Sequence, residues 1–402
     1  MIRFVPEDFA AGASAAGDGL ADTVPTQIDD LPGWRYPWPL DVERLRALQP
    51  LMWRAPSAHN TQPWRLLPGP EAIEVGWEEP YVLGPSDPSR RDLRLSLGAF
   101  VETCLVVSAG AGVPARFAPA YDERARRVGR LVGARTVYRT PFTAADVTAR
   151  RTWRGRFTRE QPGEALLAGL SALARAGGAR LAVLDCPAVH PLLVEASRAF
   201  IGSPEIVAEL RRWLRPRPDH PDYHRDGLTA TALGLRWWEA LGMNWAVRQR
   251  GRRRRPGAQR GGPDAGQTRA HEGGPATRAT GGLGRLALVA RGQARSFDTD
   301  DGVVAVLLVP AATDPAGEVE AGRLVMRLLL LLARHGFAAH PHSQLIDCPS
   351  TETWVSVLAG GQGDRPIWIA RIGRPQPRQL RRVPPSARRI GPRYDRPSAP
   401  LS

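Results

Sequence analysis

Two long apolar segments, at 93–110 and 318–334, place the strongest constraint on how this chain can fold. A helix that is apolar around most of its surface has to be buried, because it presents no polar face to water. The two segments occupy similar places in the two halves of the chain, which both run in the order helix, strand, long apolar helix, strand. The sequence therefore predicts an α+β fold built from a duplicated unit that packs on itself.

Hydrophobic periodicity predicts the remaining elements. In the first half we expect a helix at 42–53 capped by Asp41, then strands at 71–77, 115–120 and 129–138. In the second half we expect helices at 164–175, 188–201, 204–214 and 228–247, and strands at 180–184, 303–309 and 367–372. Gly336 is expected to end the long helix at 317–334.

Composition divides the chain into five parts. We expect a flexible leader at 1–33, a first half at 34–145, a second half at 146–370 and a basic tail at 371–402. The second half contains an Arg/Gly-rich insert at 248–285, which has almost no apolar residues and is predicted to be disordered.

Every one of the 55 basic residues is an arginine, and the formal net charge is +15. The insert at 248–285 and the segment 371–396 each carry a net charge of +8, so the rest of the chain is close to neutral. The absence of lysine excludes Schiff-base chemistry, a pyridoxal phosphate anchor and a Walker A loop. The insert also lacks aromatic residues for base stacking, so nucleic-acid binding through it is only a weak alternative.

The compartment is predicted from the cysteines and the apolar runs. Cys104, Cys186 and Cys348 are far apart without a CxxC motif, which is typical of reduced thiols in a cytoplasmic protein. The longest apolar run, 328–333, is too short to span a bilayer, and the N-terminus lacks the pattern of a signal peptide. We therefore expect a cytoplasmic protein with no membrane partner.

The segment 54–64, RAPSAHNTQPW, gathers short polar side chains between a helix end and a strand start. Such residues can present side-chain and backbone donors to a flat polar ligand. A well-capped turn over a buried tryptophan explains the same residue types.

Two arginine-rich segments are candidates for binding a phosphate. The segment 150–154, RRTWR, places three guanidinium groups and a hydroxyl within five residues, and guanidinium groups bind phosphate in a bidentate manner. In the tail, Arg388 and Arg389 are candidates, with the choice between them open. A solvated basic turn and an unstructured tail are the alternatives.

The segment 336–344 follows the second long helix and contains an HxH pair, His340 and His342. No third ligand stands at a spacing suited to a metal, so no metal site is predicted. No catalytic acid or base is predicted anywhere in the chain.

The run PSAHNTQPW at 56–64 resembles the PSxxNxQPW signature of the FMN-dependent nitroreductase superfamily, and RRTWR resembles its RRSxR segment. Further matches to a doubled-length, actinobacterial subgroup are the segments 87–99 and 320–339. The resemblance implies a nitroreductase-like fold with two tandem halves packed as an intramolecular pseudo-dimer. It implies FMN as the cofactor, bound by these residues: Arg54, Pro56, Ser57, Asn60, Gln62, Arg150, Arg151, Thr152, Arg154, Pro341, His342, Ser343, Gln344, Arg388 and Arg389.

Ordinary members of that superfamily are homodimers, with each flavin bound between two subunits. This chain carries one PSxxN segment and one RRxxR segment, in different halves, so the resemblance implies one surviving flavin site. It also implies that residues 219–247 fall where a lid covers the flavin in the doubled subgroup.

The resemblance implies an oxidoreductase that transfers hydride through flavin N5. The donor would be NAD(P)H or another reductant, and the acceptor an electron-poor small molecule or a peptide-derived biosynthetic substrate. A protein that sequesters flavin without turnover is the alternative. We expect a monomer that acts as a pseudo-dimer, or a weak homodimer.

Overall fold

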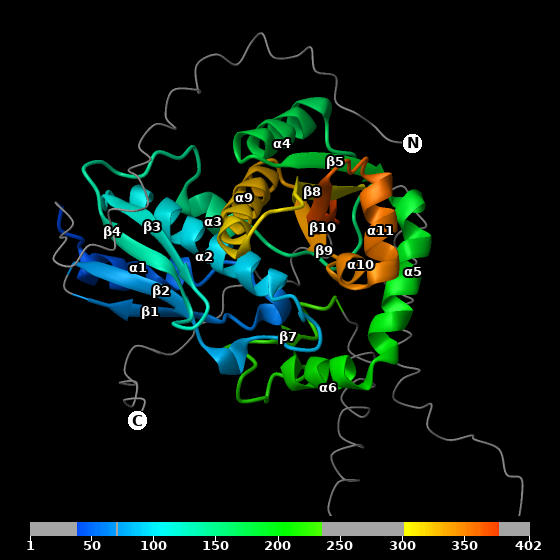
Figure 1. Cartoon of the computed structure of the whole chain (residues 1–402), viewed down its shortest axis with the longest axis horizontal. Helices are drawn as coiled ribbons and strands as arrows, with labels where there is room; N and C mark the ends of the chain where they lie inside the picture. The colour runs from blue at the N-terminus through cyan, green and yellow to red at the C-terminus, as the bar shows by residue number, and fades with distance from the viewer. Residues whose placement is uncertain (1–37, 70, 235–300, 378–402) are drawn as a thin grey trace, which may run out of the picture.

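The computed structural model describes residues 38–69, 71–234 and 301–377. The leader 1–33, the insert 248–285, and Arg388 and Arg389 lie outside the described residues. Two four-stranded antiparallel sheets stand on either side of a central pair of long helices, α2 (Arg91–Gly110) and α9 (Pro315–Arg334) (Figure 1).

The first sheet has the strand order β1-β2-β4-β3. Its strands are β1 (Trp64–Pro68), β2 (Ala72–Trp77), β3 (Ala115–Asp122) and β4 (Arg127–Gly133). Two further helices, α1 (Val42–Met52) and α3 (Ala144–Ala149), and two short 3-10 helices, η2 (Ala58–Asn60) and η3 (Glu79–Tyr81), complete this part. Asp41 caps α1 as expected, because its side chain accepts a hydrogen bond from the Arg44 N–H.

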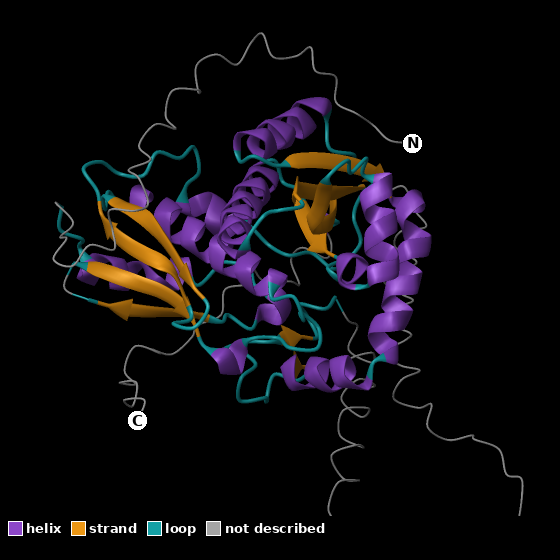
Figure 2. Ribbon diagram, viewed as in Figure 1, coloured by secondary structure: helices purple, strands orange, loops and turns teal. Residues whose placement is uncertain are grey.

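The second sheet has the strand order β5-β8-β10-β9. Its strands are β5 (Arg180–Asp185), β8 (Val303–Pro310), β9 (Ala338–Pro341) and β10 (Asp364–Gly373). One face packs on α9 and α4 (Glu164–Ala176), and the other on α5 (Cys186–Gly202), α10 (Gln344–Asp347) and α11 (Pro349–Leu358) (Figure 2). Below α5 lie α6 (Pro204–Trp213) and a parallel pair of two-residue strands, β6 (Leu214–Arg215) and β7 (Leu228–Thr229).

The two sheets are built on the same plan. In each half the chain runs helix, strand, strand, 20-residue helix, strand, strand, and the first strand lies at one edge of the sheet while the third lies at the other. The second half differs by insertions, which add α5, α6 and the segment up to residue 302 after β5, and α10 and α11 after β9. The predicted α+β fold with two tandem halves is confirmed.

The long helices touch at a glycine from each. Gly98 is the eighth residue of α2 and Gly322 the eighth residue of α9. A Cβ atom on Gly98 would lie 1.9 Å from the Val319 carbonyl oxygen, and one on Gly322 would lie 2.4 Å from the Leu95 carbonyl oxygen. Leu95 and Val319 are each the fifth residue of their helix, so the contact is reciprocal, as in an isologous two-fold interface.

Buried ion pairs lie beside this contact between α2 and α9. The Glu102 side chain is fully buried and accepts hydrogen bonds from Arg323 Nε at 3.1 Å and from Arg327 Nε at 2.9 Å. These two guanidinium groups, together with the Tyr138 hydroxyl, lower the pKa of Glu102 despite its burial. Because all three partners satisfy the carboxylate, the pairs fix which faces of α2 and α9 meet.

Helix α2 is long and apolar enough to cross a bilayer by length and composition, yet 89% of its most apolar window is buried inside the protein. Its apolar surface is covered by α9 and the first sheet, which accounts for its composition.

The prediction of a helix at 228–247 is wrong for residues 228–234, the part of this range that the structure describes. Residues 228–229 form strand β7, residues 230–234 form a turn, and the remainder lies outside the described residues. Gly227, directly before this segment, has a φ of +73°, outside the helical region, and Leu228 pairs with Leu214 as a strand. The other expected helices and strands are present, with ends that differ by a few residues.

We expect Gly98→Ala to destabilise the protein by about 1–3 kcal/mol or more, because the added methyl group meets backbone atoms that have no room to move. Gly110→Ala, at the end of the same helix, is the control, since the nearest atom to its Cβ is 4.0 Å away. Urea unfolding of both variants gives the free energies of unfolding. An equal, small effect of the two substitutions would contradict the close helix contact.

Candidate functional site

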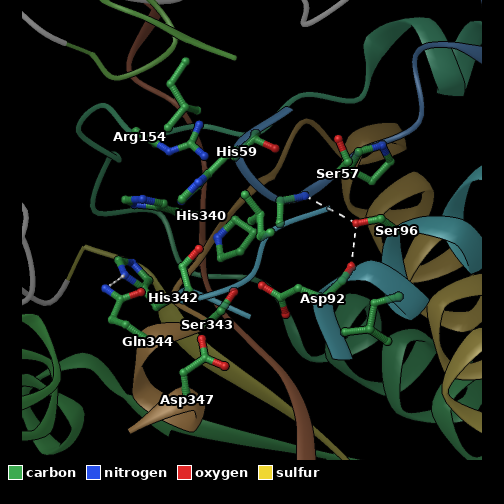
Figure 3. Close-up of a pocket in the computed structure, with 18 of the residues that line it drawn as sticks. Ser57, His59, Asp92, Ser96, Arg154, His340, His342, Ser343, Gln344 and Asp347 are labelled. Carbon is green, nitrogen blue, oxygen red and sulfur yellow. Dashed lines mark hydrogen bonds between the residues drawn. The ribbon is translucent and has the colours of Figure 1, made fainter. Parts of the chain in front are cut away.

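A cavity of about 270 Å³ lies between the two halves. Its walls come from residues 56–59, from the first turns of α2, from α5 and α6, from α9 and from the segment 339–347 (Figure 3). Of the predicted binding residues, eight line it: Pro56, Ser57, Thr152, Arg154, Pro341, His342, Ser343 and Gln344.

Two of the predicted segments, 150–154 and 336–344, are joined through β9. Thr152 and Ala339 form an isolated bridge, and the Trp153 N–H donates to the Ala339 carbonyl at 3.0 Å. The His342 N–H donates to the Ile369 carbonyl of β10 at 3.0 Å. The second sheet therefore holds 152–154 beside the segment that begins at Pro341.

The segment 57–62 has a strained backbone. His59, Asn60 and Gln62 have φ values of +47°, +55° and +53°. These values lie in the left-handed region of the backbone, which residues other than glycine rarely adopt. The Ser57 hydroxyl accepts from the Gln62 N–H at 3.0 Å, which closes the turn. Such strain costs about 1–3 kcal/mol per residue and is concentrated at functional sites. Trp64, which follows this turn, is fully buried and stacks on Phe100.

Asn60 and Gln62 do not line the cavity but hold the chain that covers it. The Asn60 side chain donates to the Gly227 carbonyl at 3.3 Å, and the Gly227 N–H returns a bond to the Asn60 carbonyl at 3.1 Å. The Gln62 amide donates to the Arg225 carbonyl at 2.8 Å. We call residues 214–233 the covering segment; its Leu214, Leu228 and Leu233 line the cavity.

Three predicted arginines gather outside the cavity without a carboxylate. Arg150 is 3% exposed, and its Nη2 donates to the Arg54 carbonyl at 2.7 Å. Arg54 donates to the Thr148 carbonyl at 2.8 Å, and Arg151 to the Ala149 carbonyl at 3.4 Å. Within residues 38–69, 71–234 and 301–377, no acidic side chain pairs with any of the three.

The Arg150 guanidinium is left partly unsatisfied. Its Nε and Nη1 are buried and find no hydrogen-bond partner among the described residues. Burial, with a further contribution from Arg54, lowers the pKa of Arg150 to about 10. A buried cation beside other cations is costly unless an anion joins it, so this arginine group is suited to bind a phosphate or another anion.

Arg154 carries the positive charge of the cavity itself. Its Nη1 donates to the Ala232 carbonyl of the covering segment at 3.3 Å, and burial lowers its pKa to about 10. Burial and Arg154 lower the pKa of His59 to about 4, and burial with Arg371 and Arg154 lowers that of His342 to about 3. Both imidazoles are therefore neutral at pH 7.

A group of carboxylates in the cavity wall was not identified from the sequence. Asp92, on α2, and Asp347, on α10, both line the cavity (Figure 3). They share the buried Arg91. Asp87 lies behind them and accepts from the N–H groups of Asp92 and Leu93. Burial and the neighbouring Asp92 raise the pKa of Asp87 to about 7 and that of Asp347 to about 8. Asp347 has no sequence signal, because only the tertiary packing brings it to Asp92.

No protein-family model matches the chain. Two curated proteins of Mycobacterium tuberculosis, from strains CDC 1551 and H37Rv, are each 28% identical to it over 177 residues, which cover 43% of this chain and 52% of the relative. Their names assign them provisionally as NAD(P)H nitroreductases. The chain is similar in sequence to these two proteins. It spans about half the length of the curated relatives that it matches.

Solved structures of two nitroreductases were also found, both called NfnB. The enzyme from Mycobacterium smegmatis, in complex with NADPH, is 14% identical, with coverage of 61% of this chain and 92% of that chain and a TM-score of 0.33. The enzyme from Sphigopyxis sp. strain HMH is 17% identical, with coverage of 62% and 94% and the same TM-score of 0.33. These scores are too low to assign the fold.

We expect stability to fall as pH rises from about 4 toward 8, through Asp87 and Asp347. In that range an unfolded aspartate, with a pKa near 3.8, has lost its proton, while the folded protein still holds protons on groups with pKa values of about 7 and 8. The folded state then binds more protons, so raising the pH favours unfolding.

Asp347→Asn removes one of these titrating groups. The free energy of unfolding, measured by urea unfolding, should therefore decline less steeply between pH 5 and pH 8 than in the wild type. Asp364→Asn, which breaks a half-exposed pair with Arg180, is the matched control and should leave the slope unchanged. The same slope in Asp347→Asn as in the wild type would contradict the raised pKa.

Proposed function

We propose that the protein is an FMN-binding oxidoreductase of the nitroreductase type. The observation that carries this proposal is the buried Arg150 guanidinium, whose Nε and Nη1 lack partners among the described residues while Arg54 and Arg151 stand beside it. This group lies at the start of the same segment that delivers Thr152 and Arg154 to the cavity. A cationic, anion-binding group at one end and a cavity at the other fit a phosphorylated, flat cofactor.

Each part of the site has a defined task in this proposal. Arg54, Arg150 and Arg151 bind the cofactor phosphate, and Pro56 and Ser57 position the ring. Arg154 stabilises negative charge on the ring, and Ser343 and Gln344 provide backbone N–H groups near it. Arg388 and Arg389 remain sequence-based predictions.

When bound, FMN would supply the hydride-transfer chemistry. The names of the Mycobacterium tuberculosis relatives favour NAD(P)H as the donor, and the acceptor is an electron-poor or biosynthetic small molecule. The chain contributes by excluding water: Leu95 and Ala99 of α2, Val325 and Leu329 of α9, and the leucines of the covering segment make the cavity walls apolar.

We expect Arg150→Gln to weaken FMN binding by about tenfold to hundredfold, because it removes charge-assisted hydrogen bonds to the phosphate. The stability of the protein without FMN should stay the same or rise, since the variant loses a buried charge that the described residues do not pair. Fluorescence titration with FMN and urea unfolding of the flavin-free protein measure the two effects.

Arg159→Gln is the matched control, because this arginine is exposed on the same stretch of chain and makes none of these contacts. Equal FMN affinities for both variants would contradict the phosphate site. A wild-type protein that is colourless and binds no added FMN would overturn the proposed function.

A second candidate function is the storage of FMN without turnover. The covering segment favours it, since Asn60, Gln62 and Arg154 all bond to its backbone and it closes the cavity with leucines. The Arg215–Asp226 ion pair, with Nη2 and Oδ1 2.7 Å apart, fastens its two short strands.

Anaerobic addition of NADPH to the FMN-loaded protein separates the two functions. We expect bleaching of the flavin absorbance in an oxidoreductase, and faster bleaching in Asp226→Ala, because loss of the ion pair loosens the covering segment. A wild-type protein that NADPH and NADH leave yellow would favour storage.

A further inference from the structure

Two carboxylates from different halves of the chain face the same cavity. Asp92 stands in the first turn of α2, and Asp347 ends α10, just after the residues from Pro341 to Gln344. Figure 3 shows both carboxylates and the Ser343 side chain directed toward one space. The Asp347 N–H donates to the Ser343 carbonyl at 2.9 Å, which fixes Asp347 behind the segment assigned to the cofactor ring.

These carboxylates have too few cations to be ionised together. Arg91, 5% exposed, is the only cation paired with Asp92 and Asp347 in the part of the chain that the structure describes. Asp87 adds a third carboxylate and is occupied as a cap of α2. Three negative charges around one guanidinium in a buried place are costly, so the group retains a proton near neutral pH.

The geometry assigns this proton to Asp347. Arg91 gives two hydrogen bonds to Asp92, from Nε at 3.3 Å and Nη2 at 3.0 Å, but only one to Asp347, from Nη2 at 2.9 Å. The shared guanidinium therefore stabilises the charge of Asp92 more than that of Asp347. The Oδ2 of Asp347 has no partner among the described residues and can carry the proton into the cavity.

The other titratable groups that line the cavity are poor proton donors. His59, His340 and His342 are neutral, because burial and nearby arginines lower the pKa of each. Arg154 keeps its proton at neutral pH even with its lowered pKa. Burial, Asp92 of α2 and Asp87 before it raise the pKa of Asp347 to about 8, although Arg91 acts in the opposite direction.

We propose that Asp347 is the general acid that protonates the acceptor when it is reduced in this cavity. This proposal rests on the proposed oxidoreductase function. For a quinone acceptor, bound FMN would supply two electrons and one hydrogen as a hydride, and Asp347 would supply the one proton that is still needed, by breaking its O–H bond. The product is the hydroquinone, and the Asp347 carboxylate regains its proton from water.

The first test compares two acceptors of pre-reduced, FMN-loaded protein in anaerobic stopped flow. Menadione needs a proton as well as electrons, whereas ferricyanide takes only electrons. Asp347→Asn should slow flavin reoxidation by menadione about 100-fold, as expected for loss of a general acid, and leave reoxidation by ferricyanide unchanged. The decline of the menadione rate with rising pH should disappear in the variant.

Asp364→Asn is the control for loss of an aspartate–arginine pair away from the cavity, and it should match the wild type with both acceptors. Asp347→Glu keeps a carboxyl group and should recover part of the menadione rate. Equal menadione rates in the wild type and Asp347→Asn would overturn the proposal, and so would an equal loss with both acceptors.

A second test needs no flavin. Infrared difference spectra of the flavin-free protein between pH 6 and pH 9 should show protonated carboxyl bands from Asp87 and Asp347, and the Asp347 band should be absent from Asp347→Asn. Unchanged bands in the variant would place the proton elsewhere and refute the assignment. Failure to bind FMN, or to be reduced by NADPH, would instead contradict the proposed function and leave the infrared result standing.

Discussion

The contact between Gly98 and Gly322 is the constraint on which the rest of the structure depends. It lets the α2 and α9 backbones approach more closely than any side chain would allow. Because the contact is reciprocal, it reproduces within one chain the interface of a two-fold dimer. The cavity exists as a consequence, since Leu95 and Ala99 on one helix and Val325 and Leu329 on the other form its adjoining walls.

Charge is distributed unevenly around that cavity. Arg150 is buried and Arg154 half-buried on one side, where arginines outnumber acids, and Asp92 and Asp347 lie on another side, where carboxylates outnumber cations. Both arrangements reduce the stability of the folded protein, as does the left-handed backbone near His59. In the proposed function the same features prepare the site to bind an anion and to hold a proton, so stability would be lost where that function requires it.

The covering segment shows where interpretation from sequence fell short. Periodicity at 228–247 indicated a helix, but Gly227 turns the chain and the leucines of the helical pattern close the cavity instead. Asn60 and Gln62 were assigned to the cofactor from a motif, and their side chains hold the covering segment in this structure. A motif pointed to the segment 56–64, while the contacts of Asn60 and Gln62 depended on a segment some 160 residues away.

The sequence alone determined the duplicated α+β plan, the two buried helices and the segments that supply the cavity, because hydrophobic periodicity and short motifs are local properties of the chain. Only the tertiary structure decided which residues meet. It brought Asp92 and Asp347, 255 positions apart, together around Arg91. The Arg91 guanidinium pairs with both carboxylates and also donates to the Ile346 carbonyl. It also left Arg150 without an acidic partner among the described residues. Such pairings arise from the packing of distant segments, so no local pattern records them.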